Sequence, residues 1–145
     1  MKINSFKDLK VWKLSHKLSI EVAKLVKTFP KDEKYDLADQ MRRSSRSIPS
    51  EIAEGFGRFH FSDKLTFYER GNASLLELKN HFEEAKENKY IDDKEYGCYQ
   101  KKMDEIGFLL VRMMSKIREA RDKFQRVTCP PKPPELSGWL RRRKE

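Results

Sequence analysis

The segment from Ser44 to Ser50 holds four serines and is the nearest approach in this chain to a cluster of nucleophiles. Serine catalysis requires a histidine base and, in many hydrolases, a strand-turn-helix elbow that exposes the hydroxyl group. Neither feature surrounds these serines in the sequence. Because small hydroxyl side chains on helices commonly bond to the backbone or allow close packing, we expect them to be structural.

The chain contains three histidines, His16, His60 and His81, and two cysteines, Cys98 and Cys129. A di-iron site in a helical bundle requires a glutamate on each of two helices and a Glu-x-x-His pair on each of the other two. Glu77 and His81 are four residues apart, which is the wrong spacing. The cysteines have no metal-ligand spacing either. We therefore expect no metal, no other cofactor, no small-molecule substrate and no catalytic activity.

Cationic side chains are the most informative chemical feature of the sequence. The chain has 32 lysine and arginine residues against 23 acidic ones, a net charge of +9, and a basic surface attracts polyanions. Nucleic acid is the commonest such partner. The candidates for contact with phosphate groups are Lys10, Lys13, Lys17, Lys24, Arg42, Arg46, Arg141, Arg142 and Arg143. The competing interpretation is a solvated face whose ion pairs are worth less than about 1 kcal/mol each.

Arg43 favours a different interpretation. A buried arginine needs a carboxylate partner, since an unpaired buried charge is very costly. Glu54 and Glu77 are polar residues in segments with a helical pattern, and either could pair with Arg43 inside the bundle or across a subunit boundary. The sequence therefore predicts a structural ion pair at Arg43 and leaves Arg42 and Arg46 for a ligand.

Apolar residues recur at steps of three and four along four segments, which is the spacing that places them on one face of a helix. The expected helices are Asp8–Phe29, Tyr35–His60, Ser62–Asn88 and Asp92–Phe124. Ser62 and Asp92 are the expected N-caps of the last two, and Phe124 is expected on the buried side of the fourth. Pro49 lacks a backbone donor and is expected to kink or split the second helix.

Four amphipathic helices joined by short loops pack most simply as an all-α, up-down-up-down four-helix bundle. We expect this domain to span residues 1–127. Residues 128–145 contain a proline-rich stretch followed by basic residues, and we expect them to form a flexible tail. This tail could grip RNA, with Trp139 stacking on a base, dock on a protein partner, or be inert.

Three large side chains, Trp12, Leu65 and Leu76, lie away from the main apolar stripes. Aromatic and aliphatic side chains on the flank of a bundle often mark assembly surfaces, so we expect these three at an oligomer interface. The alternative for each is additional core at the ends of the bundle.

The sequence also predicts a cytoplasmic location. The first residues lack the apolar run of a secretory signal, and no stretch approaches the roughly 20 apolar residues of a membrane span. Two cysteines without a disulfide framework fit the reducing cytosol. We expect no contact with a membrane.

The segment from Gln40 to Arg58 resembles the signature of one bacterial family, the four-helix-bundle proteins encoded by intervening sequences within 23S rRNA genes. Phe6–Trp12 is similar to the opening of that family, and Gly71–Leu78 and Tyr90–Ile91 are similar to its third helix and the turn after it. The resemblance covers about residues 5–120, and residues after Val127 fall outside the family pattern.

The resemblance implies a bundle that assembles as a ring-shaped homopentamer. It also implies a similarity in fold to the accessory proteins of diversity-generating retroelements, which bind RNA and a reverse transcriptase. We therefore expect a non-enzymatic oligomeric scaffold that binds nucleic acid, with RNA favoured over DNA. The alternative is a protein-interaction module that recruits a partner enzyme, such as a reverse transcriptase, through its surface or through residues 128–145.

Overall fold

The computed structural model describes residues 2–128, and these residues form helices without any β-strand. The long helices are α1 (Lys10–Leu25), α2 (Leu37–Gly57), α3 (Phe61–Glu87) and α4 (Asp93–Thr128). Three short 3₁₀ helices accompany them: η1 (Phe6–Asp8), η2 (Val26–Thr28) and η3 (Lys31–Tyr35). The all-α prediction is confirmed for this part of the chain.

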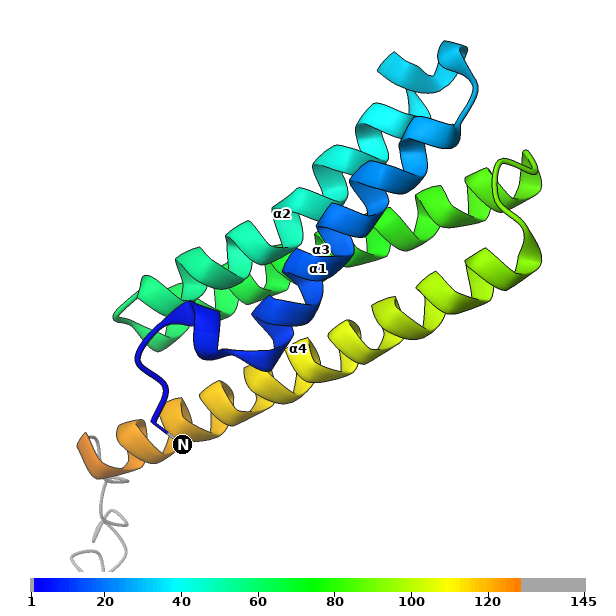
Figure 1. The fold of residues 1–145 in the computed structure, drawn as a ribbon. Coiled ribbons are helices and arrows are strands. Elements are labelled where there is room, and N and C mark those ends of the chain that lie inside the picture. Colours follow the sequence, from blue (N-terminus) through cyan, green and yellow to red (C-terminus); the bar gives the residue numbers. More distant parts are fainter. Residues whose placement is uncertain (1, 129–145) are drawn as a thin grey trace, which may run out of the picture.

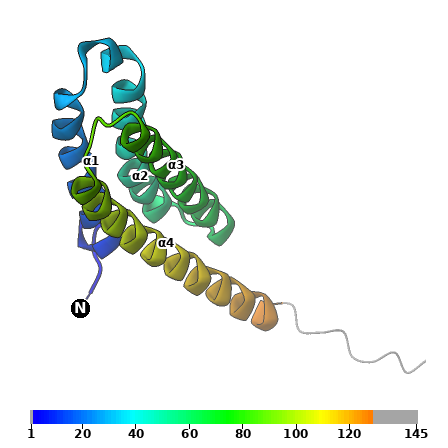
Figure 2. The same ribbon diagram turned by 90° about the vertical axis from the view of Figure 1, so that its right-hand side faces the viewer.

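Successive long helices run in opposite directions, as an up-down-up-down bundle does (Figure 1). The packing of α2 against α3 is the most extensive, whereas α1 and α4 meet over a much smaller area. Both views show that α4 continues past the other helices at the end where α2 joins α3 (Figures 1 and 2). The last buried side chain of α4 is Met114, and the partly buried Ile117 still packs against the core, so the helix after Ile117 lies outside it.

The helix ends agree with the sequence at some positions and differ at others. Asp92 is confirmed as an N-cap, because its carboxylate accepts a hydrogen bond from the Glu95 amide at 2.7 Å, and the Asp92 amide donates one to the Glu95 carboxylate at 3.3 Å. The prediction for Ser62 is wrong, since α3 begins at Phe61 with His60 as its N-cap. The Lys64 ammonium group donates to the carbonyls of Gly55 and Phe56. These hydrogen bonds hold the start of α3 against the end of α2, across the connection that joins them.

The sequence predicts a kink or a break in the second helix at Pro49. The break does not occur, because α2 is continuous through this residue. The buried side chains of Ile48 and Ile52 hold the turns on either side of the proline against the core. Phe124 was expected on the buried side of α4, but it is 60% exposed. The reason is that α4 has by then passed the end of α1, and the Phe124 ring meets Phe61 at the start of α3 without being covered by it.

Glycine allows α2 and α3 to approach closely. A Cβ atom on Gly55 would lie 2.5 Å from Cε1 of Tyr68, which is a fully buried side chain. Burial of the Tyr68 phenol raises its pKa to about 12. Gly71 lies opposite on α3, where a Cβ would meet Cβ of Glu51 at 3.5 Å.

We expect Gly55→Ala to lower the free energy of unfolding by about 1–3 kcal/mol, because the new methyl group must displace Tyr68 or push the helices apart. Urea unfolding measures this change. Gly57→Ala is the matched control, since nothing lies within 4 Å of a Cβ there. It should leave stability unchanged or raise it by up to about 1 kcal/mol. Equal unfolding midpoints for the two variants would contradict the close approach.

Candidate nucleic-acid interface

The lysines of α1 lie on the side of the helix away from its buried stripe. Lys13, Lys17 and Lys24 are exposed, and the structure pairs none of them with a carboxylate within residues 2–128. Lys10 lies 3.1 Å from Glu105 of α4, but both side chains are largely exposed, so this pair stabilises the bundle only weakly. The charges on α1 therefore remain accessible to an anion.

The two arginines predicted to contact a ligand have different surroundings. Arg46 is exposed on α2, as the sequence predicts. Arg42 is not free: its guanidinium donates to the Lys34 carbonyl at 2.9 Å and lies 3.8 Å from the Asp39 carboxylate. Its side chain is only 25% exposed, so Arg42 fastens the segment before α2 and is less accessible to phosphate than expected.

The pairing predicted for Arg43 within the chain is wrong. Arg43 lies 2.9 Å from Asp39, one turn earlier on α2, and its side chain is 80% exposed. Glu77 instead lies 3.4 Å from His81 on α3. A partner four residues away on the same helix is available without burying either charge, which explains why Glu54 and Glu77 are not used. The pairing across a subunit boundary stays a prediction.

A groove of about 680 Å³ runs between α1 and α2, and its floor is mostly apolar. Trp12 lies at one end. Its ring is stacked on that of His16, with ring centres 4.6 Å apart, and is edge-on to that of Phe6, with ring centres 5.0 Å apart. The floor is formed by Ile20, Ala23, Pro49 and Ala53, and the rim by Lys24, Lys27 and Arg46. The groove thus combines an apolar surface with a cationic edge.

A second apolar surface lies on the opposite face of the bundle, where α3 packs beside α4. Leu76 is 57% exposed there, and Phe108 and Val111 of α4 are exposed as well. The ion pairs Lys79–Asp104, at 2.8 Å, and Arg118–Glu69, at 3.1 Å, link the same two helices. Leu65, predicted at the interface, is instead buried in the core. Because α3 packs between α2 and α4, two of its sides are covered.

The sequence did not single out the loop between α2 and α3 or the helix surface beside it. The guanidinium groups of Arg58 and Arg70 lie over the ring of Phe67, 4.4 and 5.1 Å from its centre. Phe59, next to Arg58, has 93% of its surface exposed. An aromatic residue in a short polar connection was the available signal in the sequence.

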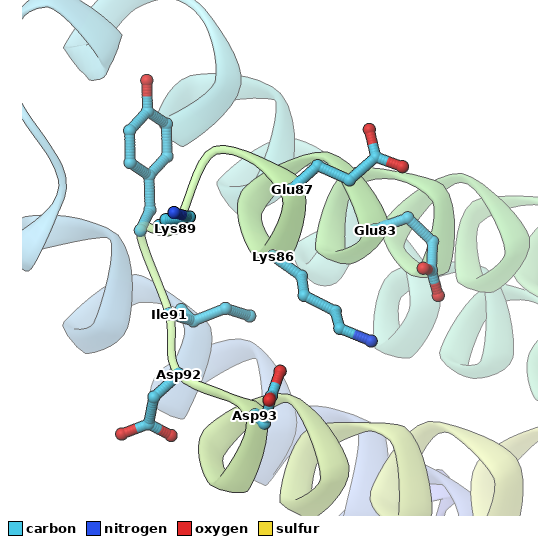
Figure 3. Close-up of a pocket in the computed structure, with 8 residues that line it drawn as sticks. Glu83, Lys86, Glu87, Lys89, Ile91, Asp92 and Asp93 are labelled. Atoms are coloured by element: carbon cyan, nitrogen blue, oxygen red, sulfur yellow. The ribbon is translucent and has the colours of Figure 1, made fainter.

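The turn between α3 and α4 has the opposite charge. The segment Glu83–Glu95 holds six acidic and three basic residues, a net charge of −3. Its side chains line an open pocket but do not converge, since the carboxylates of Glu87 and Asp92 point in opposite directions (Figure 3). The Tyr90 hydroxyl donates to Glu33 at 2.7 Å, and this hydrogen bond raises the pKa of Tyr90. These contacts join η3 to the turn.

The residues considered for catalysis make local contacts. The hydroxyls of Ser44, Ser45 and Ser50 donate to backbone carbonyls one turn earlier, and the hydroxyls of Ser47 and Ser74 lie 2.9 Å apart between α2 and α3. Within residues 2–128 no three histidine, cysteine or acidic side chains are grouped as metal ligands would be. Arg141, Arg142 and Arg143, and the partner-binding role of residues 128–145, fall on a stretch of which only Thr128 is described.

Comparison with known proteins supports the geometry of the bundle. A family model described as 23S rRNA-intervening sequence protein matches residues 7–112. The crystal structure of a protein with unknown function from the S23 ribosomal protein family of Bacteroides thetaiotaomicron is similar, with a TM-score of 0.68 and 21% sequence identity. The match covers 72% of this chain and 95% of that one. No curated protein matches the chain. Among the described helices, none has the length and apolar character to cross a membrane.

Proposed function

The chain belongs to the 23S rRNA-intervening sequence protein family, and on that premise we propose that it is a non-enzymatic oligomeric scaffold that binds nucleic acid, RNA in preference to DNA. The observation that supports this most directly is the set of exposed α1 lysines, Lys13, Lys17 and Lys24, which have no carboxylate partner in residues 2–128. The preference for RNA follows from the resemblance to RNA-binding accessory proteins.

The physical basis of binding is the release of counterions. Each lysine that neutralises a phosphate frees condensed cations, so affinity falls steeply as salt is added. Paired surface charges contribute less, because the carboxylate already neutralises the cation. Lys13, Lys17 and Lys24 of α1 and Arg46 of α2 meet the requirement better than Lys10 or Arg42, which have partners of their own.

The proposed oligomer rests on the two apolar surfaces. The groove between α1 and α2 and the Leu76–Phe108 surface between α3 and α4 lie on opposite faces of the bundle, and they differ in shape. Contact between unlike surfaces of successive copies is heterologous, and such contacts close into a ring when the rotation allows it. The resemblance implies five copies. Lys24 and Arg46 lie on the rim of the groove between α1 and α2, whereas Lys13 and Lys17 do not line it. Several copies would therefore multiply the weak affinity of the part of the basic face that lies outside the contact.

We expect the triple variant Lys13→Gln, Lys17→Gln and Lys24→Gln to weaken binding to single-stranded RNA at low salt. The slope of log affinity against log salt should become shallower by about 2, since each lost phosphate contact removes about 0.7. Fluorescence anisotropy with labelled RNA, repeated over a range of salt concentrations and with DNA of the same sequence, measures both quantities.

The matched control removes the same charge elsewhere, by Lys31→Gln, Lys94→Gln and Lys101→Gln, all of them exposed. This control should keep the original slope. If both triple variants lose affinity equally, the α1 face is not the binding surface. If the unchanged protein binds neither RNA nor DNA at low salt, the proposed function is wrong.

We expect Ile20→Lys, in the groove, and Phe108→Lys, on the opposite face, each to reduce the mass of the oligomer. A heterologous contact needs both surfaces, and a buried ammonium group without a partner opposes association. Light scattering measures the mass. Ile3→Lys places the same charge on another exposed isoleucine, outside the groove, and should leave the mass unchanged. A monomeric unchanged protein, or equal masses for all variants, would refute the arrangement.

A further inference from the structure

Phe59 lies at the tip of the connection between α2 and α3 and is 93% exposed. Its one aromatic neighbour in the described part of the chain is His60, whose ring is edge-on with its centre 5.6 Å away. The same end of the molecule carries a second exposed ring, Phe124 of α4. Its centre lies 6.3 Å from the centre of the partly buried Phe61 ring. Phe59 and Phe124 are therefore two accessible aromatic rings that lie outside the hydrophobic core.

Cations outnumber carboxylates on the segments that carry these rings. Arg58 and Arg70 are held over the Phe67 ring, and the structure pairs neither with a carboxylate in the part of the chain it describes. The final stretch of α4, residues 112–128, adds six cationic and two acidic residues, a net charge of +4. Within residues 2–128, two of the six are in ion pairs, Arg118 with Glu69 and Arg121 with Asp122.

The aromatic rings and the surplus of cations occur at one end of the bundle, and the acidic turn between α3 and α4 lies at the other (Figure 1). An anion approaching the molecule is therefore attracted to the end that carries Phe59. Guanidinium groups fixed on an aromatic ring lose less freedom when they bind phosphate, because their positions are already restricted.

We propose that this end of the bundle binds an unpaired segment of nucleic acid, with a base stacked on Phe59 and the adjoining phosphates on Arg58 and Arg70. A ring exposed on both faces suits the face of a single base, which a duplex hides within its stack. The cations select a polyanion over an uncharged aromatic ligand. This inference rests on the proposed function and adds single-strandedness as the property that the site recognises.

The test uses the full chain with three labelled probes: oligoadenylate RNA, the corresponding DNA, and an RNA duplex. We expect Phe59→Ala to weaken binding of both single strands roughly 5- to 100-fold, which corresponds to the loss of one stacked base. Affinity for the duplex should change by less than about twofold. Because Phe59 is almost fully exposed, the variant should fold normally, as circular dichroism will verify.

Tyr35→Ala is the matched control, because Tyr35 is 84% exposed and ends η3, in the connection from α1 to α2, which lies at the opposite end of the bundle (Figure 1). It should leave binding of both single strands unchanged. Phe59→Trp, in contrast to Phe59→Ala, should keep the affinity for single strands. It should also supply an indole whose fluorescence is quenched by a stacked base. The double variant Arg58→Gln and Arg70→Gln should make the salt slope for single strands shallower by about 1.4. Arg43→Gln, which removes a cation already paired with Asp39, should change that slope less.

The outcomes separate this inference from the function on which it rests. If the protein binds single strands but Phe59→Ala binds them as tightly, or loses single strands and duplex equally, the stacking site is wrong while the scaffold proposal stands. If the unchanged protein binds none of the probes at low salt, both fail. If Phe59→Ala instead abolishes capture of a protein and leaves the probes unaffected, the surface belongs to a protein partner and the inference is overturned.

Discussion

Close packing between α2 and α3 is the constraint on which the rest of the structure depends. The missing side chain of Gly55 lets the Tyr68 ring of α3 fit directly against the α2 backbone, and Gly71 of α3 lies against Glu51 and Ile48 of α2. Lys64 then closes the end of α2 by donating to two of its last carbonyls, and burial lowers the pKa of this lysine. A connection of three residues can join helices held this closely. In so short a connection the Phe59 side chain does not turn back onto the helices, and it is exposed to solvent.

Ion pairs between helices supplement the apolar packing where it is limited. The contact between α1 and α4 is limited, and there Lys102 donates to Glu21 at 2.5 Å, a hydrogen bond that raises the pKa of the lysine. Similar pairs join α4 to α3. These interactions pair Glu21, Glu69 and Asp104 with cations of neighbouring helices. Lys13, Lys17 and Lys24 of α1 and the arginines beside Phe67 have no such partner within residues 2–128, so unpaired positive charge is concentrated on particular surfaces of the molecule.

Periodicity in the sequence was sufficient for the architecture, because a stripe of apolar residues defines both a helix and its covered side. It was also sufficient for Asp92, whose cap is a local interaction. Leu65 and Phe124 were assigned incorrectly for a common reason. Whether a side chain is covered depends on where neighbouring helices begin and end, and α3 has neighbours on two sides while the end of α4 has few. Arg43 was assigned incorrectly because Asp39, one turn earlier on α2, supplies a closer carboxylate. The Phe67 contacts join an arginine from a loop with one from a helix, and spacing alone does not indicate such a pair.

The length of α4 beyond Met114 has a geometric consequence. An α-helix turns by about 100° and advances about 1.5 Å with each residue, so the fourteen residues from Met114 to Thr128 carry the basic end about 21 Å along the axis. The contacts of Phe124 with Phe61 and of Arg118 with Glu69 fix the rotational phase of this extension. Related chains could therefore vary its length by about seven residues, two turns, and present the same face. A change of one or two residues would swing the cations to another side while leaving the core intact.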